Sequence, residues 1–202
     1  MKTGTQYINE MTEIRMHGRG GNGAFTAARL LGLSAAVYED KYAQAFPSFG
    51  PERRGAPILA FTRISNEPIF DHSQIYECDH VIVLDETLCE VTDVTAGLKE
   101  DGCLIINSKE NPGAFFPGNG FKPPKRFLTI DANGIARDFL GKPIVNTVML
   151  GAVLGAADIV SFVSLEKAID EILPEKAREK NKAAARFAYE ESVKALTNEA
   201  GI

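Results

Sequence analysis

The sequence predicts an α/β fold in which a mostly parallel sheet is flanked by helices and the C-terminal end is helical. Two continuous apolar runs, HVIVL at residues 80–84 and CLIIN at residues 103–107, have the length of strands and are typical of the interior of a parallel sheet. Strand-like and helix-like segments alternate along most of the chain, and helical patterns follow from about Ile144. The length of 202 residues is that of one domain, so we expect residues 1–202 to form a single unit.

The first half of the chain contains two predicted strands and a predicted helix. Thr12–His17 alternates between polar and apolar residues and predicts a strand that ends at a glycine cluster. Asn22–Tyr38 keeps apolar residues at helical spacing, and its first residue could cap the helix. Lys41–Arg54 is rich in proline and glycine and predicts a loop-rich segment. Ala56–Ile64 predicts a second strand, with Pro57 at its entry or on a sheet edge.

The second half adds the two apolar strands, a further strand and several helices. We expect a helix-compatible stretch at Glu86–Glu100 and an irregular loop at Asn111–Lys125, which holds four Pro and three Gly. A short strand is expected at Arg126–Ile130. The last expected helices, in chain order, are Ile135–Leu140, a helix from about Ile144, Leu165–Leu173 and Glu175–Leu196. Ser164 would cap the third of these helices, and Pro174 suits the first turn of the fourth.

Composition excludes several classes of function. The chain has 22 Lys and Arg against 27 Asp and Glu, a net charge of −5, which argues against binding nucleic acid or an anionic membrane. Its three cysteines are too few for a four-cysteine iron–sulfur cluster and lack CxxC spacing, so we expect no metal site and a reducing compartment. The first eleven residues lack the apolar core of a secretory signal, which predicts a cytoplasmic protein. The apolar stretch at residues 143–163 contains Asn146 and Asp158, which favours a buried or interface helix over a membrane span.

A glycine-rich loop with the pattern GxGxxG lies between the first predicted strand and the first predicted helix. Its residues are Gly18, Arg19, Gly20, Gly21, Asn22 and Gly23. Glycines let the backbone approach a ligand, and the helix N-terminus offers free N–H groups, so phosphate is the natural ligand, with Arg19 as an added cation. A dinucleotide site would also need an acid after the second strand, whereas Glu39 and Asp40 come directly after the helix. A tight turn without a ligand is the plain alternative.

The segment that follows, YAQAFPSFGPERRGAP at residues 42–57, combines aromatic and charged residues between prolines and glycines. The residues that we single out are Phe46, Pro47, Phe49, Glu52, Arg53 and Arg54. Adjacent arginines in such a turn can grip phosphate or carboxylate, and aromatic rings in such a loop are typical of a partner interface. Both interpretations remain open from the residues alone.

Several stretches together resemble one known family. They are HGRGGNGAFTAARLLG, KYAQAFPSFGPERRGAPILAFTRIS, SQIYECDHVIVLD and IVNTVMLGAVLG. These stretches resemble the gamma subunit of pyruvate:ferredoxin oxidoreductase (pyruvate synthase) and its 2-oxoacid relatives, over roughly residues 13–172. The FPSFGPERRGAP string is far more specific than the GxGxxG pattern.

The resemblance implies a complex that oxidatively decarboxylates pyruvate with coenzyme A to give acetyl-CoA, CO₂ and reduced ferredoxin. It implies that thiamine diphosphate, Mg²⁺ and [4Fe–4S] clusters are held by the alpha, beta and delta subunits, and that this chain binds no cofactor tightly. The chain alone would be non-catalytic; it would assemble with those subunits, meet ferredoxin through the complex, and engage coenzyme A. The glycine loop then becomes a candidate for the phosphates of coenzyme A, and the segment from Phe46 to Arg54 would face a neighbouring subunit near the substrate channel.

Three other hypotheses stay beside this one. The chain could be the gamma subunit of a branched-chain 2-oxoacid:ferredoxin oxidoreductase, since these members share the motifs. It could be a stand-alone NAD- or FAD-dependent oxidoreductase that uses the GxGxxG loop. It could also be an assembly scaffold in which the glycine loop is only a turn.

Overall fold

The structure is a computed structural model that describes residues 11–48, 55–115 and 124–199. Its sheet has six strands: β1 (Thr12–Arg19), β2 (Tyr42–Pro47), β3 (Pro57–Ser65), β4 (Cys78–Val83), β5 (Leu98–Asn107) and β6 (Arg126–Ile130). Its α-helices are α1 (Ala24–Tyr38), α2 (Ala132–Leu140), α3 (Asn146–Ala156), α4 (Phe162–Ile172) and α5 (Glu175–Glu199). Two short 3₁₀ helices, η1 (Glu86–Glu90) and η2 (Pro112–Ala114), complete the described elements.

The strand order is β2-β3-β1-β4-β5-β6. Strands β1, β4, β5 and β6 run parallel, and β3 pairs antiparallel with both β1 and β2. The predicted α/β class with a mostly parallel sheet is therefore confirmed, with an antiparallel pair at one edge. Because the four parallel strands point the same way, their carboxyl ends meet at one edge of the sheet, which is where ligands bind in open α/β folds.

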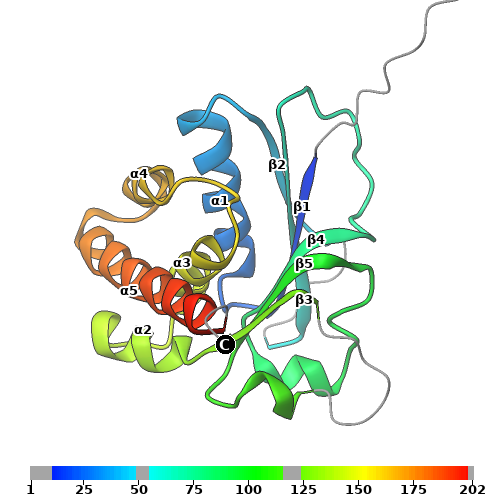
Figure 1. Cartoon of the computed structure of the whole chain (residues 1–202). Helices are drawn as coiled ribbons and strands as arrows, with labels where there is room; N and C mark the ends of the chain where they lie inside the picture. Colours follow the sequence, from blue (N-terminus) through cyan, green and yellow to red (C-terminus); the bar gives the residue numbers. More distant parts are fainter. Residues whose placement is uncertain (1–10, 49–54, 116–123, 200–202) are drawn as a thin grey trace, which may run out of the picture.

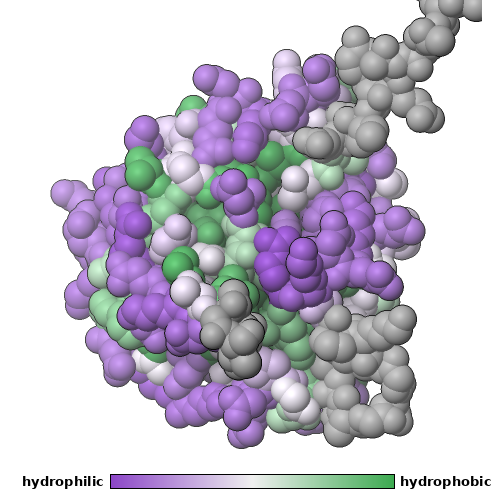
Figure 2. All heavy atoms as spheres, in the orientation of Figure 1, coloured by the Kyte–Doolittle hydropathy of each residue, from purple (hydrophilic) through white to green (hydrophobic). Residues whose placement is uncertain are grey.

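The helices lie on one face of the sheet, as Figure 1 shows. Helix α3 is buried along nearly its whole length between the sheet and α5, which confirms the expected buried helix in the apolar stretch. Gly151 and Gly155 face the backbone of α5 so closely that a Cβ at either position would meet the carbonyl of Ala185 or Tyr189. Apolar residues gather between the helix layer and the strands, and hydrophilic residues cover the flanks (Figure 2). No described helix is both long enough and apolar enough to cross a bilayer.

The opposite face of the sheet is covered by loops. Residues of β3, β4 and β5 pack there with Ile75, Leu88 and Val94 in a second apolar cluster. The predicted helix at Glu86–Glu100 is wrong, since only η1 forms. The physical reason is that buried Arg15 takes the carbonyls of Val94 and Ala96, at 3.1 and 2.5 Å, which a helix would use for itself.

Three further details differ from the prediction. Part of the expected loop-rich segment forms the edge strand β2, because its alanines pack under Gly32 of α1 and Phe46 packs on Phe61. Asn22 does not cap α1, whose N-cap is Gly23 with a left-handed backbone. Ser164 is not the cap of α4 either: the cap is Ser161, whose hydroxyl accepts from the Ser164 N–H.

Candidate functional site at the glycine loop

The glycine loop lies at the carboxyl end of β1 and is tied to the start of β3. Gly18 and Arg19 are the last residues of β1. The N–H of Gly20 donates to the carbonyl of Ala56 at 2.9 Å, and the N–H of Gly55 donates to the carbonyl of Gly20 at 3.1 Å. The loop is therefore fixed by the sheet before α1 begins.

Two glycines give the loop its shape. Gly21 and Gly23 have φ values of 94° and 87°, which L side chains rarely adopt. Nothing lies within 4 Å of the place that a Cβ on Gly21 would occupy, so the loop is open at this point. Helix α1 has no side-chain cap and no acid in its first turn, which leaves its first N–H groups and the positive end of its dipole uncompensated by a side chain.

Two asparagine side chains pack against this loop. The amide of Asn22 lies over Gly18, where a Cβ would meet its Oδ1 at 2.6 Å, and that oxygen is buried without a hydrogen-bond partner. Asn146, the first residue of α3, packs against Gly23 in the same way, with its Nδ2 2.8 Å from an added Cβ. The N-termini of α1 and α3 therefore meet at the loop. Asn146 is buried, at 6% exposed.

Arg19 joins three segments at this edge of the sheet. Its Nε donates to Oδ2 of Asp85 at 2.9 Å, its Nη2 to Oγ1 of Thr87 at 2.6 Å, and its Nη1 to the carbonyl of Gly55 at 3.2 Å. Asp85 also caps η1 by accepting from the Thr87 N–H at 3.0 Å. Partial burial raises the pKa of Asp85, but the hydrogen bonds from Thr87 and Arg19 outweigh it and the pKa lies below its ordinary value. The carboxylate therefore offsets part of the charge of Arg19.

The loop-covered face of β1 carries a stripe of charged and polar residues. The alternating positions that point to this face are Glu13, Arg15, His17 and Arg19. Burial, followed by the charge of Arg15, lowers the pKa of His17 to about 3, and the neutral ring accepts from Nε of Arg15 at 3.1 Å. His17 therefore holds Arg15 in place and is not poised to exchange a proton near neutral pH.

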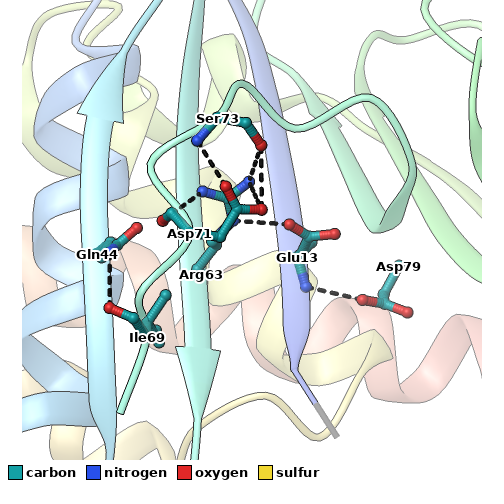
Figure 3. Close-up of polar contacts among 7 residues, drawn as sticks. All are labelled: Glu13, Gln44, Arg63, Ile69, Asp71, Ser73 and Asp79. Carbon is teal, nitrogen blue, oxygen red and sulfur yellow. Dashed lines mark hydrogen bonds and ion pairs between the residues drawn. The ribbon is translucent and has the colours of Figure 1, made fainter. Parts of the chain in front are cut away.

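A buried arginine on the neighbouring strand was missed by the sequence analysis. Arg63 is 1% exposed; its Nε donates to Glu13 at 2.8 Å and its Nη1 to the carbonyl of Asp71 at 3.1 Å (Figure 3). Its Nη2 lies 3.4 Å from the carboxylate of Asp71, and its guanidinium lies 5.4 Å from the ring centre of Phe46. The sequence signal that could have identified Arg63 is its position inside the mostly apolar strand segment PILAFTRIS.

The second predicted group of site residues is only partly described. Phe46 and Pro47 end β2, and Phe46 is half-buried with its ring 5.3 Å from that of Phe61. Phe49, Glu52, Arg53 and Arg54 lie outside the described residues. The described residues on both sides of this group lie at the glycine-loop edge of the sheet. Strand β2 ends at this edge and β3 begins there. Gly55 donates its N–H to the carbonyl of Gly20, and its own carbonyl accepts from Arg19.

The geometry disfavours a dinucleotide fingerprint. In that fingerprint the second strand lies beside the first, and its terminal acid binds the ribose. Here β3 separates β2 from β1. Glu39 and Asp40 lie beyond the far end of α1, a 15-residue helix, so roughly 22 Å separates them from the loop. Glu39 is moreover engaged with Lys41 at 3.1 Å and with the N–H of Ser161 at 2.5 Å.

The cysteines are packing residues. Burial raises the pKa of Cys103 to about 12 and that of Cys78 to about 11, so both stay protonated and unsuited to bind iron. Cys89 is half-buried, and burial raises its pKa to about 11. Among the described residues, no group of three or more His, Cys, Asp or Glu could hold a metal ion.

A pocket of about 420 Å³ lies at the carboxyl end of β6, between α2 and α5. Its polar lining includes Asp131, Asp138 and Glu191. Three carboxylates would repel a phosphate, so the glycine loop is the better anion site.

Comparisons with known proteins agree on one family. The family model described as pyruvate ferredoxin/flavodoxin oxidoreductase matches residues 13–191. The chain is 55% identical to pyruvate synthase subunit PorC of Methanothermobacter marburgensis over 89% of its length and 97% of the relative. It is 50% identical to the pyruvate/ketoisovalerate oxidoreductases common subunit gamma of Pyrococcus furiosus, over 90% and 97% of the two chains. The crystal structure of pyruvate oxidoreductase subunit PORC from Thermotoga maritima matches with a TM-score of 0.76 and 37% identity, over 89% and 96%.

Proposed function

The chain belongs to the pyruvate ferredoxin/flavodoxin oxidoreductase family, as a gamma subunit of its complex, and we propose that it holds a phosphate group of coenzyme A at the glycine loop. The complex oxidatively decarboxylates pyruvate with coenzyme A, giving acetyl-CoA, CO₂ and reduced ferredoxin. In the proposal, thiamine diphosphate, Mg²⁺ and [4Fe–4S] clusters are held by alpha, beta and delta subunits in the cytoplasm, and this chain is inactive alone.

One observation carries the proposal: two helix N-termini, neither capped by a side chain, meet at an open glycine loop. Backbone N–H groups and helix dipoles attract phosphate without needing a side-chain charge. Gly21 leaves room for close approach, and the buried amides of Asn22 and Asn146 fill the space behind the loop. Arg19 adds positive charge, reduced by Asp85.

The segment from Phe46 to Arg54 forms the second part of the proposal. We place Phe46, Pro47, Phe49, Glu52, Arg53 and Arg54 toward a neighbouring subunit near the substrate channel. The support is that both ends of this segment lie beside the glycine loop. The two arginines would supply the local positive charge that the acidic chain otherwise lacks.

The second candidate function is a gamma subunit that also serves branched-chain substrates. The Pyrococcus relative is named for both pyruvate and ketoisovalerate, and the chain is 50% identical to it. A panel of 2-oxoacids, assayed on the co-purified complex with coenzyme A and a low-potential acceptor, tests this. Turnover of 2-ketoisovalerate at a rate near that of pyruvate would favour the broader substrate range.

The coenzyme A role is tested by placing a charge in the first turn of α1. Thr26→Glu adds an acid at the third helical position, where it complements the dipole and should stabilise the isolated chain by about 0.5 kcal/mol. The same charge would repel a phosphate. We expect the KM for coenzyme A of the assembled complex to rise severalfold at unchanged KM for pyruvate. Thr26→Gln is the matched neutral control, and equal KM values for the two variants would refute the proposal.

A further inference from the structure

Two large aromatic side chains protrude from the loop between β3 and β4. Phe70 is 85% exposed and Tyr76 is 73% exposed. Both belong to the segment of residues 66–77, which crosses the loop-covered face of the sheet (Figure 1). Aromatic rings with this exposure lose the hydrophobic stabilisation that burial would give, and such residues are enriched at the centres of protein interfaces.

The segment that carries these rings is held firmly to the sheet. Buried Arg63 binds both the carbonyl and the carboxylate of Asp71, and Gln44 donates to the carbonyl of Ile69 at 3.3 Å (Figure 3). Ile75 is 2% exposed in the second apolar cluster, directly before Tyr76. A surface fixed in this way loses little conformational entropy when a partner binds.

The segment that carries the rings is acidic. Residues 66–77 contain Glu67, Asp71 and Glu77 but no Lys or Arg, and Asp71 is paired with buried Arg63. Glu67 and Glu77, which lie at the two ends of the segment, are both exposed. The flank on which the segment lies is mostly hydrophilic (Figure 2).

We propose that residues 66–77 dock onto a basic surface of another subunit of the complex, with Phe70 and Tyr76 inserted into apolar pockets. The inference rests on the proposed function in so far as it requires the assembled complex. A two-fold contact between copies of this face would set acid against acid and is therefore disfavoured. The partner surface would carry Lys and Arg around the pockets, because charge complementarity guides association.

Photo-crosslinking in the assembled complex tests the contact. A benzophenone amino acid replaces Phe70 or Tyr76 in a tagged chain that is co-expressed with the other subunits. We expect crosslinks to a different subunit, at peptides rich in Lys or Arg. The same probe in place of Val163, which is 55% exposed on α4, is the control for exposure alone. Crosslinks to a second copy of this chain, or none in an intact complex, would overturn the proposal.

Charge reversal provides the second test. The double variant Glu67→Lys with Glu77→Lys should slow association of the complex at least tenfold, since exposed charges guide association, and leave the melting temperature of the isolated chain unchanged within about 2 °C, since surface substitutions have small effects on folding. Glu190→Lys, an exposed site on α5, is the matched control. Equal association rates for both variants would overturn the docking surface. A wild-type chain that joins no complex would instead overturn the proposed function.

Discussion

Arg19 and Asp85 join the carboxyl ends of two neighbouring parallel strands, with Nε of Arg19 donating to Oδ2 of Asp85 at 2.9 Å. The pair lies between the glycine loop and η1, and the side chains of Arg19 and Asp85 are 30% and 29% exposed. Asp85 therefore has two roles that oppose each other for an anionic ligand. It positions Arg19 beside the loop, and it offsets the charge that would attract a phosphate.

Asp85→Asn removes the charge and tests which of these two roles dominates. The amide oxygen still accepts from Thr87, but the amide nitrogen takes the place of Oδ2 and cannot accept from Nε of Arg19, which keeps its hydrogen bonds to Thr87 and Gly55. If the loop binds coenzyme A, the KM for coenzyme A should fall roughly two- to fivefold, in line with the modest strength of exposed ion pairs. Steady-state kinetics of the assembled complex measure this, with kcat expected to stay the same. A raised KM would mean that the positioning of Arg19 by Asp85 matters more for the ligand than the charge of Asp85.

Gly151→Ala should destabilise the protein although alanine favours helices. In an exposed helix this change would stabilise by about 1 kcal/mol. Here the added Cβ would meet the carbonyl of Ala185 on α5, and backbone cannot rotate away as a side chain does. We expect the free energy of unfolding to fall by about 2 kcal/mol in urea denaturation. Gly113→Ala, with nothing within 4 Å of its added Cβ and no positive φ, is the control. Equal stability of both variants would contradict the close packing of α3 on α5.

The sequence predicted the parallel strands and the buried helix because their patterns are local. HVIVL and CLIIN are almost entirely apolar since both of their faces are covered, and helix α3, which begins at Asn146 in IVNTVMLGAVLG, is buried on nearly every side. The glycine loop was found for the same reason. Its turn depends on residues that adopt a positive φ, and these stand next to one another in the chain.

Elsewhere, contacts between residues far apart in the chain determine the structure, and local sequence patterns do not predict it. The stretch at residues 91–97 was predicted to be helical, yet four β-branched residues and a glycine make it a weak helix former, and Arg15, some 80 residues earlier, takes the carbonyls of Val94 and Ala96. Strand β2 has weak strand character, and it forms because β3 and α1 offer a partner and a surface. The role of Arg63 depends on Asp71 and Glu13, which no spacing rule connects.

Arg63→Met should weaken the attachment of the loop at residues 66–77 to the sheet more than it lowers the stability of the whole fold. Methionine fills part of the space of the arginine stem, but the carboxylates of Glu13 and Asp71 lose their partner. The two carboxylates are 18% and 50% exposed and can regain water, so the cost to the fold should stay below the roughly 3–5 kcal/mol of a pair whose remaining charge is buried. Hydrogen exchange is followed by mass spectrometry in the variant and in the wild-type chain. The increase in exchange rate on substitution should be larger in residues 69–75 than in the core strand β4. Arg29→Met, at an exposed site on α1, is the control. Unchanged exchange in the loop would mean that Ile75 alone holds it.

The stability of the chain should fall as the pH drops from about 6.5 to 5, because two buried histidines resist protonation. Burial lowers the pKa of His17 to about 3 and that of His80 to about 4. In the unfolded chain both titrate near 6.5, so below that pH the unfolded state binds protons that the folded state does not. Their stabilising contribution is complete above pH 6.5 and falls by roughly 2 kcal/mol per histidine at pH 5.

Urea denaturation at several pH values measures the effect, and His80→Gln identifies its source. The Nδ1 atom of His80 is buried without a hydrogen-bond partner, so glutamine gives up no bond there. The variant should lose about half of the pH dependence between 6.5 and 5, because one of the two proton-binding groups is gone. The same pH dependence in the variant and the wild-type chain would show that His80 is not protonated on unfolding in this range, and that the slope comes from other groups.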